Sequence, residues 1–265
     1  MILVIGMRNR KDYDKRDGAT GLKRRLEQLT GQPVLTMHYA DASPVTVNAV
    51  APRAIVITGS PDPWPTIRVA DLYGLSDLLH TTSIPLLAIC QGHQLIGHCF
   101  NHDLRKVRRL PDEPMRKCRP GEPDTGAVKG HPGCYYADAF VEVELLRPDP
   151  IFAGLGRRIR VRESHRCEIK KLPQGFRRLA QSADCKYEMI RHGERLFYGM
   201  QFHAERWEKP YMAGRTILVN FFRLAGVLNP SSTVIGTFFL KIAEIANDSY
   251  SWFSPSSKCV GTKLM

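Results

Sequence analysis

The stretch that most constrains the fold is residues 85–100, PLLAICQGHQLIGHCF. It begins with a continuous apolar run that ends at Cys90, typical of a strand buried on both faces. Apolar residues at helical spacing follow at once, and Gly92 leaves room for a sharp turn and for close packing of a helix. We therefore predict a strand, a turn and a helix, with a thiol exposed at the turn as in a nucleophile elbow. The positive potential at a helix N-terminus favours the thiolate of such a cysteine.

A base and an orienting group for this thiol lie near the other end of the chain. Residues 196–203, LFYGMQFH, alternate like a strand, and His203 and Glu205 lie two apart. Residues two apart in extended backbone share a face. We therefore expect Glu205 to hold the imidazole of His203 while its other ring nitrogen meets Cys90. A cysteine nucleophile needs such a base, and the base needs such an orienting group.

Strand-like and helix-like segments alternate before Cys90. These segments are expected, in chain order, at residues 2–5, 22–29, 33–39, 54–58 and 67–79. The alternation favours an α/β fold whose parallel sheet is covered by helices on both faces. Later strands at the sheet edge or in a hairpin, and a last helix, are expected at residues 135–145, 160–162, 179–182, 188–191 and 211–224. Gly226 then suits the end of that helix.

The motifs AICQGHQ and YGMQFHAER together resemble the two signatures of the class I (triad) glutamine amidotransferase family. That family hydrolyses the side-chain amide of glutamine and passes on the ammonia. The resemblance covers residues 1–226 and implies a flavodoxin-like, doubly wound, mostly parallel sheet with helices on both faces. We predict one domain at residues 1–226 and a C-terminal extension at residues 227–265, formed by a helix at residues 234–246 and a flexible end.

The resemblance also implies roles for residues outside the triad. Backbone N–H groups of Gly59 and Gln91 would stabilise the oxyanion of an acyl-transfer step. The α-amino acid end of glutamine would be held by Gln94, Ser164 and His165. The sequence departs from the family in three places. The loop at residues 59–61 is Gly-Ser-Pro where many members have Gly-Gly-Pro or Gly-Gly-Gly, and Cys167 stands where an acidic residue is common. Residues 206–208, Arg-Trp-Glu, stand where relatives often have a proline.

Residues 108–134 form an insert rich in proline, glycine and charge, which we interpret as a mobile surface loop near the mouth of the site. Cys118, His131 and Cys134 in this insert match no usual zinc spacing. We predict neither a metal nor another cofactor.

Composition narrows the remaining possibilities. No run of eighteen apolar residues suggests a membrane span, and Met1 leads directly into a strand rather than a signal peptide. Seven cysteines without a CxxC pair favour reduced thiols and a cytoplasmic protein. The formal net charge of +12 suits an anionic partner or substrate. Zinc-finger, RNA-recognition and helix-turn-helix patterns are missing, so nucleic-acid binding is not expected.

Three functions are compatible with this pattern. The first is glutamine hydrolysis through a γ-glutamyl thioester on Cys90, with release of ammonia to a separate synthase subunit. The second is a stand-alone γ-glutamyl hydrolase or peptidase, which the Gly-Ser-Pro loop favours. The third is a non-catalytic regulatory protein on the same fold, against which the complete set of Cys90, His203 and Glu205 argues. The basic charge and the C-terminal extension favour the first.

Overall fold

The computed structural model describes residues 1–13, 18–127 and 130–229. The strands are β1 Ile2–Gly6, β2 Val34–His38, β3 Ala54–Ile57, β4 Leu86–Ile89, β5 Phe140–Leu145, β6 Arg158–Arg162, β7 Phe176–Gln181, β8 Met189–His192 and β9 Phe197–Met200. The α-helices are α1 Arg10–Tyr13, α2 Gly18–Thr30, α3 Pro44–Val50, α4 Tyr73–Thr81, α5 Gln91–Asn101 and α6 Ala213–Leu224. Residues 1–228 form one compact unit around a single nine-stranded sheet.

The sheet has the order β2-β1-β3-β4-β9-β8-β7-β5-β6. The pairings from β2 through β9 are parallel, and those from β9 through β6 are antiparallel. Every residue of β1, β3, β4 and β9 is buried. These four strands are therefore covered on both sides, as their continuous apolar runs predict.

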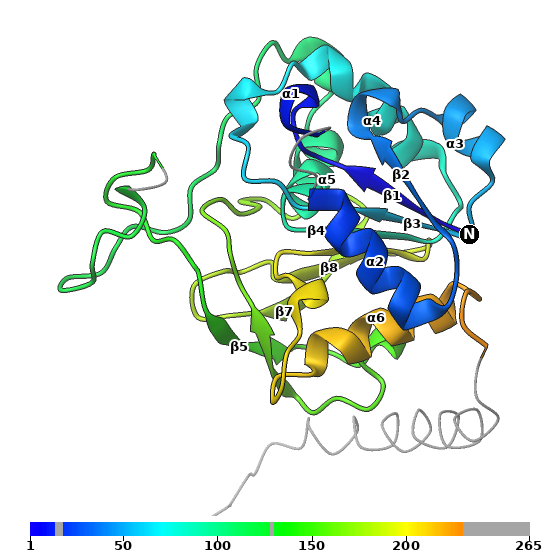
Figure 1. Cartoon of the computed structure of the whole chain (residues 1–265). Helices are drawn as coiled ribbons and strands as arrows, with labels where there is room; N and C mark the ends of the chain where they lie inside the picture. Colours follow the sequence, from blue (N-terminus) through cyan, green and yellow to red (C-terminus); the bar gives the residue numbers. More distant parts are fainter. Residues whose placement is uncertain (14–17, 128–129, 230–265) are drawn as a thin grey trace, which may run out of the picture. The chain divides into compact units, whose positions relative to one another are not determined.

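Helices cover both faces of the parallel half (Figure 1). Alternate residues of one buried strand enter two separate cores, because side chains alternate across a strand. Leu87 and Ile89 pack with apolar residues of α2 and α6, whereas Leu86 and Ala88 pack with those of α4 and α5. The predicted α/β fold with helices on both faces is thus present, with the antiparallel half as an addition to the parallel sheet.

Several element boundaries differ from the prediction, and the strand expected at residues 135–145 begins only at Phe140. The helix expected at residues 67–79 begins at Tyr73, because the four residues before it form the 3-10 turn Val69–Leu72. The strand expected at residues 196–203 ends at Met200. At the other end of the fold, α6 closes in a Schellman motif: Gly226 has φ +67°, and the N–H groups of Gly226 and Val227 donate to the carbonyls of Arg223 and Phe222.

The insert at residues 108–134 extends along one side of the molecule (Figure 1). Its described residues form neither an α-helix nor a named strand, and single bridges pair Lys117 with Cys134 and Pro114 with Cys167. The N–H of Met115 donates to the carbonyl of Arg166 at 2.9 Å. The insert is therefore attached to the segment that carries Ser164 and His165. Its mobility stays a prediction.

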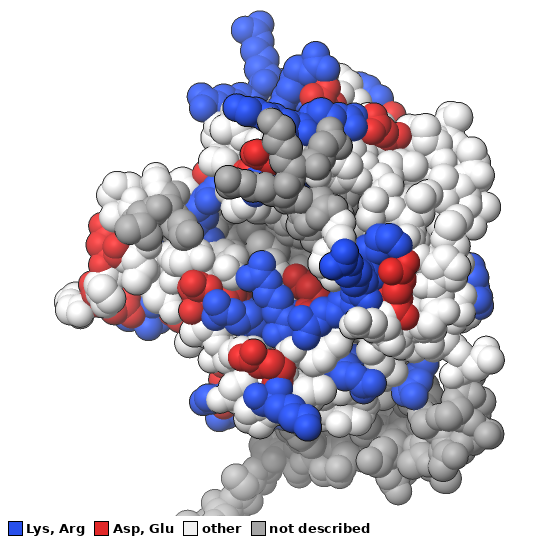
Figure 2. Space-filling view, viewed as in Figure 1, with Lys and Arg blue, Asp and Glu red and all other residues white. Residues whose placement is uncertain are grey.

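The helix predicted at residues 234–246 lies outside the described residues, and the domain division at residue 226 stays a prediction. Among the described residues, no helix has the length and apolar character needed to cross a membrane. Lys and Arg side chains gather at the top of the molecule and in a band across the face in Figure 2, with Asp and Glu among them. The excess of Lys and Arg over Asp and Glu gives the chain its formal net charge of +12.

Candidate active site

Cys90 occupies a strained turn between β4 and α5. Its backbone has φ 51° and ψ −109°, a conformation that a non-glycine residue rarely adopts. The Cys90 N–H donates to the carbonyl of Met200 at 2.8 Å, and the Gly92 N–H donates to that of Thr58 at 3.2 Å. A Cβ atom on Gly92 would lie 2.8 Å from a methyl carbon of Ile57, so only glycine allows this approach of helix to strand. The predicted strand, turn and helix are present.

The thiol of Cys90 is more enclosed than the sequence predicts, because the residue is only 5% exposed. The carbonyl oxygen of Ser164 lies 4.0 Å from its sulfur. Gly59 covers another side: a Cβ atom there would meet the Cβ of Cys90 at 3.0 Å and the Cε1 of His203 at 3.1 Å. Segments distant in sequence therefore close over the turn.

His203 and Glu205 lie together, but not for the reason that the sequence suggests. The expected extended backbone is wrong, because β9 ends at Met200 and Ala204–Arg206 form a 3-10 turn. The His203 N–H donates to the carbonyl of Arg162 at 2.8 Å, which fixes the start of the turn beside β6. Within the turn, His203 Nδ1 donates to Glu205 Oε1 at 2.6 Å. The other ring nitrogen is left for the Cys90 thiol, which is in hydrogen-bond contact with His203.

The three side chains shift one another's proton affinity. Burial alone would raise the pKa of Cys90, but the charge and hydrogen bond of His203 outweigh it and lower that pKa. Burial alone would lower the pKa of His203, yet Glu205 and Cys90 hold it well above its usual value. Burial would likewise raise the pKa of Glu205, and His203 lowers it. The arrangement therefore favours a thiolate–imidazolium pair beside a carboxylate.

The two predicted oxyanion donors lie beside the sulfur. Gly59 lies beside Cys90 and His203, so close that an added Cβ atom would touch both residues, and Gln91 is the first residue of α5. A backbone N–H in the first turn of a helix has no helical carbonyl to bind. The Gln91 side chain points elsewhere, because its Nε2 donates to the carbonyl of Asp62 at 2.6 Å. The oxyanion role of these N–H groups stays a prediction.

The residues predicted to hold substrate differ in their accessibility. Gln94 is buried, and its amide is engaged by Trp64, Gln201 and the carbonyl of Cys167. His165 is also buried, with Nδ1 3.0 Å from the Cys167 carbonyl and Nε2 2.5 Å from Glu163. Ser164 is half-buried, and its carbonyl faces Cys90. Substrate binding by Gln94 or His165 stays a prediction and would require exchange of an internal bond.

Residues 19–225 match the family model described as glutamine amidotransferase class-I. The chain belongs to the class I glutamine amidotransferase family. It is 33% identical to a subunit of the glutamine-hydrolysing GMP synthase of Thermococcus kodakarensis over 182 residues, which are 69% of this chain and 80% of that protein. The protein of the same description from Pyrococcus abyssi is 35% identical, also over 69% of this chain and 80% of that protein.

Solved structures agree in fold with this amidotransferase. A putative GMP synthase subunit from Thermoplasma acidophilum has a TM-score of 0.61 at 22% identity, over 85% of this chain and 94% of that one. The CTPS glutaminase domain of Trypanosoma brucei, solved with bound acivicin, has a TM-score of 0.61 at 13% identity, over 87% and 96% of the two chains. The predicted family, fold class and glutamine amidotransferase activity are confirmed.

Three residues close to the amidotransferase site are missing from the sequence-based prediction. Gln201 Nε2 lies 3.7 Å from Cys90 Sγ. This residue lies two positions before His203 in the same motif, so its place was a usable signal. Glu163 and Glu188 meet as a buried carboxyl pair next to His165. Nothing in the local sequence announces this pair, because folding alone brings its members together.

Two clusters of side chains among the described residues have the chemistry of metal ligands. His131 lies with Asp112 and Cys167, rather than with Cys118 and Cys134. Its Nε2 is 3.0 Å from Asp112 Oδ2, but Arg166 Nε lies 3.9 Å from the same oxygen and would face a cation there. The second cluster is Glu163, His165 and Glu188. Its burial favours protonation of the carboxyl groups, which opposes cation binding.

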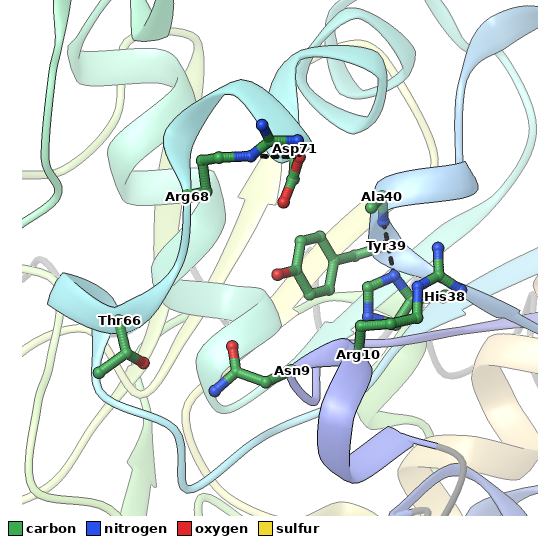
Figure 3. A pocket seen from close by; sticks show the side chains of 8 residues that line it. All are labelled: Asn9, Arg10, His38, Tyr39, Ala40, Thr66, Arg68 and Asp71. Carbon is green, nitrogen blue, oxygen red and sulfur yellow. Dashed lines mark hydrogen bonds and ion pairs between the residues drawn. The ribbon is translucent and has the colours of Figure 1, made fainter.

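A cavity of about 470 Å³ lies at the carboxyl ends of β1 and β2. Figure 3 shows its polar wall, in which Arg68 is paired with Asp71 and the Ala40 N–H donates to His38 Nδ1. Cys90 and His203 are not among its lining residues. This cavity is therefore separate from the triad, although both lie at the sheet edge where α/β proteins bind ligands.

Proposed function

We propose that this chain hydrolyses glutamine through a γ-glutamyl thioester on Cys90 and releases ammonia to a separate synthase subunit. The observation that supports this mechanism is the connected set of a strained thiol, an imidazole in contact with it, and a carboxylate 2.6 Å from the imidazole. Such a set activates a cysteine for acyl transfer.

His203 takes the thiol proton, and the Cys90 thiolate attacks the side-chain carbonyl carbon of glutamine. The negative oxygen of the tetrahedral intermediate accepts from the backbone N–H groups of Gly59 and Gln91. When the carbon–nitrogen bond breaks, His203 gives its proton to the leaving nitrogen and ammonia departs. A water molecule, deprotonated by His203, then attacks the thioester, which yields glutamate and restores the thiol. Glu205 keeps the imidazole in the orientation and protonation state that both steps need.

We further propose that the ammonia acceptor is a synthase subunit of the GMP synthase type. The relatives at 33% and 35% identity are each named as a subunit of that glutamine-hydrolysing synthase. The band of Lys and Arg in Figure 2 would complement an acidic surface on such a partner. A cytoplasmic location is part of this proposal, because the six cysteines of the described residues are all free thiols.

The stand-alone γ-glutamyl hydrolase is the second candidate. It is favoured by the Gly-Ser-Pro sequence of the loop at residues 59–61. In that loop Ser60 Oγ accepts from the Asp62 N–H at 3.0 Å, and Arg166 donates to the Pro61 carbonyl at 3.1 Å. The loop is thus held by contacts within this chain and needs no partner to adopt its shape.

The test combines labelling with turnover. We expect acivicin, the ligand of the Trypanosoma brucei domain, to modify Cys90 in peptide mapping. Cys90→Ser should lose ammonia release from glutamine by roughly a thousandfold or more. Cys99→Ser is the matched control. Cys99 lies in α5, the helix that follows Cys90, and burial raises its pKa to about 12, which makes it a poor nucleophile. Addition of a synthase subunit that co-purifies with this chain from the source cells should stimulate glutamine hydrolysis. Faster cleavage of γ-glutamyl peptides than of glutamine, unaffected by that subunit, would favour the second candidate.

A further inference from the structure

We propose that Gln201 is a catalytic residue that donates a hydrogen bond to the nucleophilic sulfur, and that a line of buried polar side chains orients it for this task. The proposal rests on the proposed role of Cys90 as nucleophile. Gln201 is fully buried directly after β9, and its backbone N–H donates to the carbonyl of Glu188 at 2.8 Å. Its Nε2 lies 3.7 Å from Cys90 Sγ, within hydrogen-bond reach of sulfur.

The orientation of the Gln201 amide follows from its neighbours. Trp64 Nε1 can only donate, and it lies 3.0 Å from Gln94, so the Gln94 atom facing it is the oxygen. Gln94 Nε2 then donates to the Cys167 carbonyl at 2.7 Å, which can only accept, and to Gln201 Oε1 at 3.2 Å.

With its oxygen facing Gln94, Gln201 presents its nitrogen to the sulfur. Rotation of Gln94 would place donor against donor at Trp64 and acceptor against acceptor at Cys167. Rotation of Gln201 alone would place a nitrogen against the Gln94 nitrogen. Because buried polar groups are costly when unpaired, the line Trp64–Gln94–Gln201–Cys90 has one favourable direction.

A hydrogen-bond donor at the sulfur stabilises the negatively charged form of Cys90 on which the reaction depends. The Ser164 carbonyl oxygen, 4.0 Å from Cys90 Sγ, can accept from a thiol but opposes a thiolate. A buried N–H donor has the opposite preference, since hydrogen bonds to charged acceptors are stronger than those to neutral ones. The sulfur is negative before it attacks the amide carbon and again when the thioester breaks. Gln201 keeps its protons throughout and stabilises both of these states, while His203 exchanges the reacting proton.

The pH dependence of Cys90 alkylation tests the donor without relying on glutamine turnover. Iodoacetamide is a small neutral electrophile, and peptide mapping shows the rate at Cys90 alone. In Gln201→Met, which keeps the volume and loses the donor, we expect the alkylation midpoint to rise by about one pH unit and the rate at pH 7 to fall about tenfold. Trp64→Phe removes only the orienting N–H, and a smaller shift in the same direction is expected.

Tyr198→Phe is the control for a general loss of packing. It removes another buried hydrogen bond of β9, from Tyr198 to Asp149 at 2.7 Å, away from the sulfur. It should leave the midpoint unchanged. An unchanged midpoint in both Gln201→Met and Trp64→Phe, with thermal melting lowered as in Tyr198→Phe, would overturn the proposal. Failure of the proposed function would be seen separately, as glutamine hydrolysis that persists in Cys90→Ser.

Discussion

A rise in pH should destabilise this protein through one buried pair of carboxyl groups. Glu163 and Glu188 are 1% and 0% exposed, and their ligand atoms and that of His165 all lie within 4.8 Å of one another. Burial raises the pKa of Glu163 from its ordinary value of 4.5 to about 7. Burial and the charge of Glu163 raise the pKa of Glu188 well above its usual range. Two carboxyl groups so close cannot both ionise easily, so the native state retains a proton that the unfolded chain releases.

The magnitude follows from Glu163. Between pH 4.5 and about 7 the unfolded state has lost this proton while the native state still holds it. The native state binds more protons in this window, so the free energy of unfolding falls as pH rises. At about 1.4 kcal/mol per pH unit, the loss is about 3 kcal/mol. The contribution of Glu163 is complete below pH 4.5 and lost above pH 7.

Glu188→Gln tests the retained proton. Burial and the charge of Glu163 hold the pKa of Glu188 well above its usual range, and the amide has no proton to retain, so the pH dependence that Glu188 contributes disappears. Urea unfolding at half-unit steps from pH 5 to 8 should show a smaller fall for the variant, and the variant should be more stable than the parent at pH 7 by about 1–3 kcal/mol.

Glu142→Gln, a change of a charged residue on β5 with an exposed side chain, is the control and should follow the parent curve within about 0.5 kcal/mol. Parallel curves for the parent and Glu188→Gln would refute the shared proton. A variant less stable than the parent at pH 7 would show that the protonated carboxyl group of Glu188 makes contacts that the amide cannot replace.

The two remaining predictions concern turnover. His203→Ala should reduce glutamine hydrolysis by roughly a thousandfold or more, and Glu205→Ala by less. The double variant should lose little more activity than His203→Ala, because a triad acts as a unit. Additive losses in steady-state assays would contradict this. Gly59→Ala should lower kcat by about a hundredfold, the scale for loss of an oxyanion donor, because its Cβ would lie 3.0 Å from that of Cys90. Gly21→Ala, with nothing within 4 Å of the added carbon, should retain full activity, and equal kcat in the two variants would argue against a role for Gly59.

The parallel half of the sheet could be predicted from sequence because its central strands are continuous apolar runs, which indicate burial on both faces. The run that becomes β4 is buried at every position, so its apolar residues indicate a central strand without knowledge of its neighbours. β5 instead alternates charged and apolar residues, with Glu142 and Glu144 opposite Arg160 and Arg158 of β6. Such a pattern indicates a strand with one solvated face, but not which strands it joins.

The site was predictable where chemistry and proximity coincide in sequence. Cys90 lies at a strand end before a helix, and His203 and Glu205 are near neighbours. The backbone between the latter two was predicted incorrectly, because the turn depends on the bond from His203 N–H to the carbonyl of Arg162, a residue 41 positions earlier. The Glu163–Glu188 pair depends likewise on contacts that only the fold creates.

The reactive geometry is a consequence of register between three buried parallel strands. β3 leads into Gly59, β4 into Cys90, and β9 into Gln201 and His203, with Ile57 opposite Ala88 and Ile89 opposite Met200. A slip of one residue would turn every side chain of a strand to the other face, so the apolar pairing that fixes the register also fixes the site. The strain at Cys90, which costs about 1–3 kcal/mol, is sustained by the bond from its N–H to the Met200 carbonyl and by the donor from Gln201. Both of these contacts come from the segment that also presents His203. The strand that delivers the base is therefore also the one that holds the nucleophile in its strained conformation.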